Sequence, residues 1–82
     1  MTELEAIQII KDENLQNYNW FDNHELQPNE VEITKQENVW TVATADERTT
    51  RISKMSYKSE SEALNDFIER LRADKVLNQY YK

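Results

Sequence analysis

His24 is the only histidine of the chain, and Asp22 and Glu25 lie close to it in the sequence. These residue types are those of a metal site or an acid–base pair. Catalytic zinc sites usually recruit more than one histidine, however, and structural zinc sites combine cysteine with histidine. A solvated or capping histidine in a turn is therefore the favoured interpretation, and we expect neither a metal ion nor a cofactor.

Other catalytic arrangements find little support. Serine, histidine and aspartate are all present, but no segment resembles a nucleophile elbow, and the chain has no glycine for an oxyanion loop. The absence of cysteine excludes a thiolate nucleophile and disulfides. Glu30 and Glu32 share one face of a predicted strand, yet a solvated face explains them better than a glycosidase pair. We predict that the protein is not an enzyme.

The charge is distributed unevenly along the chain. Residues 1–41 contain two lysines against nine acidic residues, whereas residues 42–82 contain eight basic residues against seven acidic ones. Nucleic-acid binding depends on clustered lysine and arginine, so we expect no direct nucleic-acid ligand. A field of one sign attracts a partner of the opposite sign and speeds its association. The asymmetry favours a basic partner, although such a surface can also serve solubility alone.

The length and composition allow one small domain, residues 1–82. The hydrophobic share of 38% includes periodic aliphatic residues as well as tryptophan and tyrosine, which is typical of a folded chain rather than a disordered one. No apolar run approaches the roughly 20 residues that span a bilayer. The first ten residues carry Glu3 and Glu5 and no basic residue, which is not the pattern of a signal peptide. We expect a cytoplasmic protein without membrane contact.

The first element predicted to position these residues is a helix that ends near Asn14. Thr2 and Glu5 have the spacing of a capping box at its start. Apolar residues at helical spacing form its predicted buried stripe: Leu4, Ile7 and Ile10, with Ala6 and Ile9 widening it. We expect Leu15 to fold back onto the core. Residues 16–29 are predicted to form an irregular connection that its aromatic side chains dock.

A β-hairpin is predicted next. Residues 30–34 alternate strictly and residues 39–45 are rich in β-branched side chains, with residues 35–38 as the turn. Pairing Thr34 with Val39 gives a register in which the apolar residues face one way. This register forms two pairs on that face, Ile33 opposite Trp40 and Val31 opposite Val42. We expect all four in the core.

The last two elements complete the fold. Residues 49–57 are predicted to be a third strand, in which Ile52 and Met55 have opposite parity, so the strand has a bulge or ends early. A helix then runs to about Leu77, followed by a polar tail, residues 78–82. Its capping box is Ser59 with Glu62, its ion pair Asp66 with Arg70, and its buried stripe Ala63, Leu64, Phe67, Ile68 and Leu71.

The predicted fold class is thus α+β, in the order α-β-β-β-α. A three-stranded antiparallel meander carries two helices packed on one of its faces, because an antiparallel sheet needs an apolar cover on at least one side. The opposite face, with Glu30, Glu32 and Thr34, has no second layer within the chain.

This succession of elements and residues has a counterpart in a known group of proteins. The segments that carry it are Glu5–Ile10, Tyr18-Asn19-Trp20-Phe21, the strand with Trp40 and Val42, Asp46-Glu47-Arg48, and Ser59–Leu64 at the start of the last helix. They resemble the small immunity proteins of bacterial polymorphic toxin systems, which are short, acidic α+β domains. The resemblance covers nearly the whole chain.

The resemblance implies a non-catalytic inhibitor that binds the catalytic domain of its cognate toxin in the cytoplasm. If the toxin is a nuclease, its substrate groove is basic, and acidic side chains are the expected contacts. These contacts are predicted to be Glu25, Glu30, Glu32, Glu37, Asp46 and Glu47. Trp20 or Phe21 is the expected apolar anchor, since aromatic residues dominate binding hot spots. On its own the protein is expected to be a monomer or a weak homodimer.

Three other functions remain open. The first is an acidic mimic of nucleic acid that inhibits a host nuclease or a nucleic-acid-binding protein. The second is a small enzyme or ligand-binding module that uses His24 with its acidic neighbours. The third is a structural domain that associates with itself through the uncovered sheet face.

Overall fold

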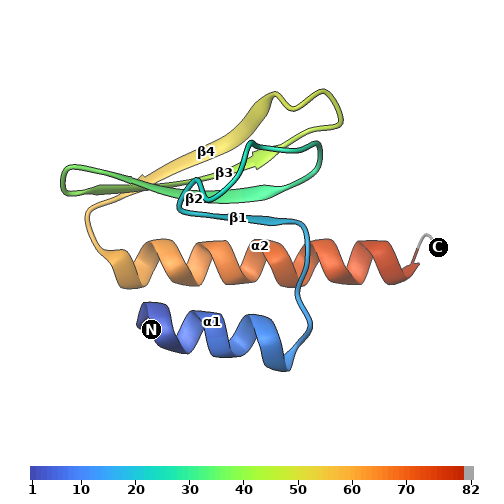
Figure 1. Ribbon diagram of the computed structural model, residues 1–82, viewed down its shortest axis with the longest axis horizontal. Helices are drawn as coiled ribbons and strands as arrows, with labels where there is room; N and C mark the ends of the chain where they lie inside the picture. The colour runs from blue at the N-terminus through green and yellow to red at the C-terminus, as the bar shows by residue number, and fades with distance from the viewer. Residues whose placement is uncertain (81–82) are drawn as a thin grey trace.

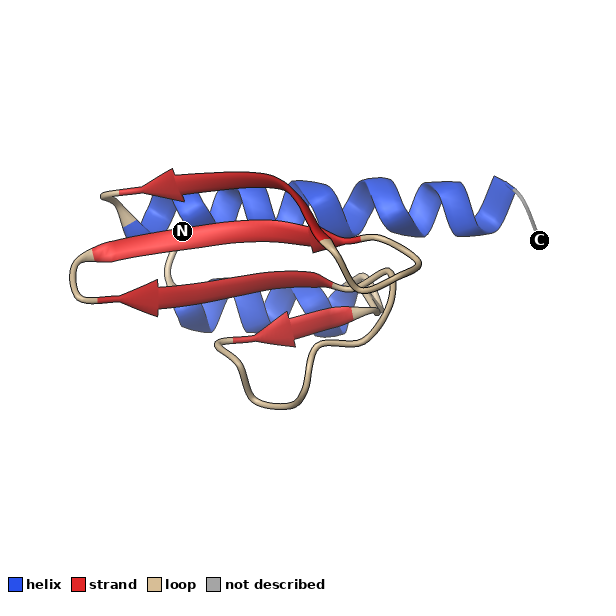
Figure 2. Cartoon of the chain, turned by 90° about the horizontal axis from the view of Figure 1, so that it is seen from above, coloured by secondary structure: helices blue, strands red, loops and turns tan. Residues whose placement is uncertain are grey.

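The computed structural model describes the backbone of residues 1–80 and the side chains of residues 1–77. In this part of the chain the elements are α1 (Glu3–Asp12), β1 (Tyr18–Trp20), β2 (Val31–Gln36), β3 (Val39–Ala45), β4 (Arg51–Tyr57) and α2 (Glu60–Tyr80). The strands form one mixed sheet in the order β1-β2-β3-β4. Both helices lie on one face of it (Figure 1), here called the inner face, and Figure 2 looks onto the outer face. The predicted α+β class is confirmed.

The sheet contains a strand that the sequence pattern did not predict. Tyr18, Asn19 and Trp20 form β1 inside the segment predicted to be an irregular connection. The three predicted strands form an antiparallel meander, β2-β3-β4, but β1 makes the sheet four-stranded and mixed instead of three-stranded. β1 pairs in parallel with β2, and Tyr18 faces Val31. Parallel strands are not joined by a hairpin turn, so no hairpin pattern links β1 to β2 in the sequence. Tyr18 and Trp20 pack against the core, and Asn19 between them lies on the outer face.

The β2–β3 hairpin has a two-residue turn, Glu37 and Asn38, instead of the predicted turn of residues 35–38. The pairing differs from the predicted register by two residues, because Thr34 faces Thr41. A shift of two residues leaves every side chain on its own face of the sheet. The inner face therefore carries the predicted residues, three buried and the last half-buried: Val31, Ile33, Val42 and Trp40.

A bulge interrupts the pairing of β3 with β4. The register shifts between Val42 and Thr44, and Ser53 on β4 has a φ of 52°. The bulge explains the opposite parity of Ile52 and Met55 and confirms one of the two alternatives given by the sequence. Both side chains remain about half exposed, because β4 is the edge strand of the sheet.

Helix α2 supplies most of the core beneath the sheet. Its predicted apolar stripe is fully buried: Ala63, Leu64, Phe67, Ile68 and Leu71. The predicted pair of Asp66 and Arg70 is present at 2.9 Å, and Tyr57 donates a hydrogen bond to the same carboxylate. The helix runs to Tyr80, beyond the predicted end, and the last two residues of the predicted tail lie outside the described residues.

Helix α1 packs against α2 with one side of the predicted stripe. The capping box of Thr2 and Glu5 is confirmed, but the buried residues are Ala6 and Ile10. Of the predicted stripe, Ala6 and Ile10 are buried and Ile9 is half-buried, whereas Leu4 is 78% exposed and Ile7 is 38% exposed. Ala6 is fully buried, and α1 runs beside α2 on the inner face of the sheet (Figure 1). Leu15 folds back onto the core as predicted.

The turn between β3 and β4 contains a strained residue, and relieving the strain is expected to stabilise the fold. Thr49 has a φ of 65°, a left-handed conformation that costs a residue other than glycine about 1–2 kcal/mol. Glycine removes this cost, but the additional backbone entropy that it loses on folding lowers stability by about 0.5–1 kcal/mol. Thr49→Gly should therefore raise the free energy of unfolding by about 0.5–1 kcal/mol in urea titrations.

The neighbouring Thr50 provides the control for this substitution, because its φ is not positive. Thr50→Gly relieves no strain and adds only backbone entropy, so it should lower the free energy of unfolding by about 0.5–1 kcal/mol. Equal effects of the two substitutions would show that the conformation of Thr49 is not strained.

Candidate partner-binding site

Two acidic loops meet at the end of the sheet where β2 begins and β3 ends (Figure 2). The amide of Ala45 donates to the carbonyl of Glu30 at 2.7 Å, and the amide of Asn29 donates to the carbonyl of Asp46 at 3.1 Å. These hydrogen bonds join the β1–β2 loop to the β3–β4 turn. The two joined loops carry four of the predicted contact residues, here called the acidic corner: Glu25, Glu30, Asp46 and Glu47.

His24 holds the β1–β2 loop in place. Its Nε2 lies 2.9 Å from both carboxylate oxygens of Glu30, and its Nδ1 lies 2.6 Å from Oδ1 of Asn23. Its backbone carbonyl accepts a hydrogen bond from the buried side chain of Asn19, which fixes the loop to the outer face of the sheet. Among residues 1–80, no group of three acidic or histidine side chains is arranged to hold a metal ion.

The carboxylates of the acidic corner differ in their availability. Glu30 accepts from a backbone amide of its own loop as well as contacting His24, and Asp46 accepts from two backbone amides of its turn. Both therefore stabilise the loops that carry them. Glu25 and Glu47 are exposed, and their carboxylates form no hydrogen bond among the described residues. These two side chains are the ones that a partner reaches most readily.

Glu32 lies on the outer face of β2, but it is only 4% exposed. Its carboxylate accepts hydrogen bonds from Nε and Nη2 of Arg51, and this contact raises the pKa of the Arg51 guanidinium above its ordinary value. A buried, paired carboxylate has little surface to offer a partner. Strand alternation predicts an exposed Glu32. It does not reveal the burial of this side chain, because the arginine that covers it comes from β4.

The remaining predicted contact residues lie outside the acidic corner. Glu37 is in the β2–β3 turn, at the opposite end of the sheet. Trp20 and Phe21 stack edge to face with ring centroids 4.8 Å apart, and both are half-buried against the core. The structure therefore divides the predicted set into the acidic corner and separate positions.

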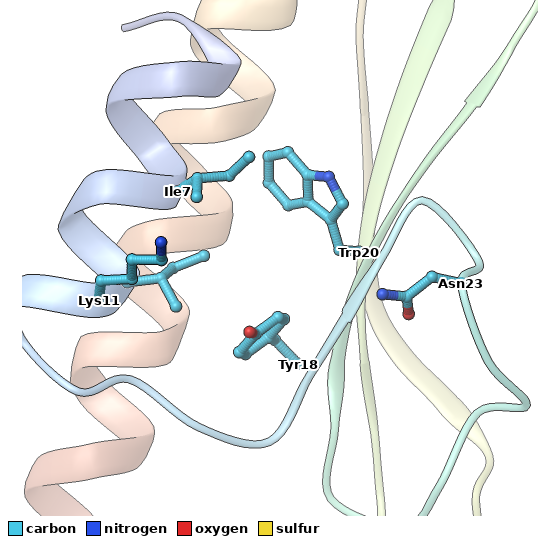
Figure 3. A pocket seen from close by; sticks show the side chains of 6 residues that line it. Ile7, Lys11, Tyr18, Trp20 and Asn23 are labelled. Atoms are coloured by element: carbon cyan, nitrogen blue, oxygen red, sulfur yellow. The ribbon is translucent and has the colours of Figure 1, made fainter.

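A pocket of about 150 Å³ opens between α1 and β1 (Figure 3). Its lining is mostly apolar: Ile7, Ile10, Lys11, Tyr18, Trp20 and Asn23. The ammonium group of Lys11 has no ion pair within the described part of the chain, and the hydroxyl of Tyr18 has no hydrogen bond there. The sequence pattern could not predict this pocket, because one of its sides is β1, which the pattern did not predict, and the other depends on how α1 packs against α2.

The candidate surfaces are thus the acidic corner and the α1–β1 pocket. Within residues 1–80, no helix has both the length and the apolar character needed to cross a membrane. Comparison of the chain with protein-family models, with curated proteins and with solved structures gave no match.

Proposed function

We propose that this protein is an immunity protein, which binds a cognate bacterial toxin domain in the cytoplasm and neutralises it without catalysing a reaction. The observation that carries the proposal is the acidic corner, where hydrogen bonds join two loops that carry four carboxylates. The excess of acidic residues in positions 1–41 and the resemblance of the sequence to immunity proteins support it as well.

A nuclease domain with a basic substrate groove is the partner that suits the acidic corner. Lysine and arginine residues that bind phosphates in such a groove can pair instead with Glu25 and Glu47, which are exposed. The negative field also speeds the encounter with a positively charged surface. A standard interface covers about 800 Å² on each partner, enough to exclude a nucleic acid from the groove.

Reversing the exposed charges of the acidic corner tests the proposal. The candidate toxin to test is the product of the adjacent upstream gene, and the variant is Glu25→Lys with Glu47→Lys. We expect its association rate constant to fall at least tenfold in low salt, because steering depends on these charges. Its dependence on ionic strength should also become weaker. Stopped-flow kinetics over a series of salt concentrations measures both quantities.

The control variant changes the same amount of charge elsewhere, with Glu37→Lys and Glu62→Lys at exposed positions outside the acidic corner. Its association rate should fall less than threefold. If both variants slow association equally, net charge matters and the acidic corner does not. If the wild-type protein neither binds the toxin nor protects cells that produce it, the proposed function is wrong.

A further inference from the structure

We infer that the α1–β1 pocket receives a large apolar side chain, phenylalanine or leucine, from a basic segment of the same partner. The inference rests on the proposed function and adds to it an apolar anchor beside the charged contacts. Such anchors in pockets provide much of the binding energy at protein interfaces.

The size and lining of the pocket suit such a side chain. A cavity of about 150 Å³ lined by aliphatic and aromatic residues has room for one benzene ring. The α1–β1 pocket has this volume, with Ile7 and Ile10 on the helix side and Tyr18 and Trp20 on the strand side (Figure 3). The ring of Trp20 offers a flat apolar wall on which an aromatic ring can stack.

The surroundings of the pocket favour a protein over a small ligand. Leu4 lies one helical turn before Ile7 and is 78% exposed. A small molecule in the pocket leaves this leucine in water, whereas a protein segment that crosses the mouth of the pocket covers it. Each Å² of apolar surface that is removed from water contributes about 25 cal/mol of binding free energy, which favours the occupant that covers more of this surface.

The pocket and the acidic corner are structurally continuous. Asn23 lines the pocket and contacts His24 at 2.6 Å, and His24 contacts Glu30 of the corner at 2.9 Å. One loop therefore borders both surfaces. A segment that places an apolar side chain in the pocket can place neighbouring lysine or arginine residues against the acidic corner.

The charges near the pocket agree with a basic partner. Helix α1 carries three exposed acidic residues, Glu3, Glu5 and Asp12, of which Glu3 lies one turn before Ile7. Lys11 is the single cation among the residues that line the pocket. Over α1 as a whole the acidic residues outnumber Lys11, so a basic segment that crosses this helix toward the acidic corner meets an excess of negative charge.

Filling the pocket tests the inference. Ile7→Trp places an indole where the partner's side chain is expected, and the exposure of Ile7 leaves the fold room for it. We expect the affinity for the toxin, measured by calorimetry, to fall at least tenfold. Ile7→Ala, which removes one wall without adding bulk, should lower the affinity at least threefold. Urea unfolding of both variants checks that the fold is retained.

Val39→Trp is the matched control, since Val39 is 40% exposed and lies at the opposite end of the sheet. It should leave the affinity for the toxin within twofold of wild type. Retention of wild-type affinity by folded Ile7→Trp overturns the inference, even when charge reversal at the acidic corner supports the proposed function.

A second measurement needs no toxin. N-acetylphenylalaninamide, titrated to millimolar concentration, should shift the backbone amide NMR signals of Ile7, Lys11 and Trp20 in a saturable way. The same titration of Ile7→Trp should shift them at least tenfold less. Saturable shifts in the wild type support the pocket even if the toxin proves to be no partner, and their absence overturns it.

Discussion

Replacing Phe67 with alanine is expected to lower the free energy of unfolding by about 3–5 kcal/mol, the usual cost of removing a buried phenylalanine. Phe67 is fully buried, and its ring contacts Tyr18 at 6.5 Å and Trp20 at 5.9 Å between centroids. It therefore joins α2 to β1, the shortest strand. A chain of 82 residues has a total stability of about 4–12 kcal/mol, so this loss is a large part of it. Urea titration followed by circular dichroism measures the effect.

Phe21 is the matched control, because its ring also contacts Trp20, at 4.8 Å between centroids, but is only half-buried. Because the Phe21 side chain is partly exposed, its truncation removes less buried apolar surface and leaves a smaller cavity. Phe21→Ala should lower the free energy of unfolding by about 1–2 kcal/mol. A cost for Phe67→Ala no greater than this would contradict the central position of Phe67 in the core.

The parts of the fold that the sequence predicts are those with a regular apolar period. The stripe of α2 repeats at helical spacing from Ala63 to Leu71, and each member is buried. β1 has only three residues, and its partner strand begins at Val31, so no local pattern announces it. The hairpin register was wrong because two registers put Ile33 and Val42 on the same face. The two registers differ in the length of the turn, which is four residues in the predicted register and two in the observed one.

The candidate site was predictable in its residue types but not in its arrangement. Charge alone indicated Glu25 and Glu47, which the structure leaves exposed. Their shared corner depends on backbone hydrogen bonds between the two loops, which no sequence pattern encodes. The alternation of β2 placed Glu32 on the outer face correctly, but its burial depends on Arg51, which lies 19 residues further along the chain.

The second large effect on stability is expected at the ion pair of Glu32 and Arg51, since its two members are buried to different extents. The side chain of Glu32 is 5% exposed and that of Arg51 is 50% exposed. Removing the arginine leaves a carboxylate buried without a cation, whereas neutralising the glutamate leaves a guanidinium that water can still solvate. Loss of one partner from a buried pair is the costly change.

We therefore expect Arg51→Met to lower the free energy of unfolding by about 2–3 kcal/mol, below the cost for a fully buried pair because Arg51 is half exposed. Glu32→Gln should cost about 1 kcal/mol, since the amide keeps the shape and can still accept a hydrogen bond. The double variant should be more stable than Arg51→Met alone, because it contains no buried, unpaired carboxylate.

Urea unfolding of the two single variants, the double variant and the wild type gives the coupling energy of the pair. Lys54→Met, which removes an exposed cation from the same strand, should change stability by no more than about 0.5 kcal/mol. If Glu32→Gln costs more than Arg51→Met, the carboxylate is solvated rather than buried. Its burial beside Arg51 bears on the proposed partner binding, in which the exposed carboxylates of the acidic corner, Glu25 and Glu47, are expected to make the charged contacts.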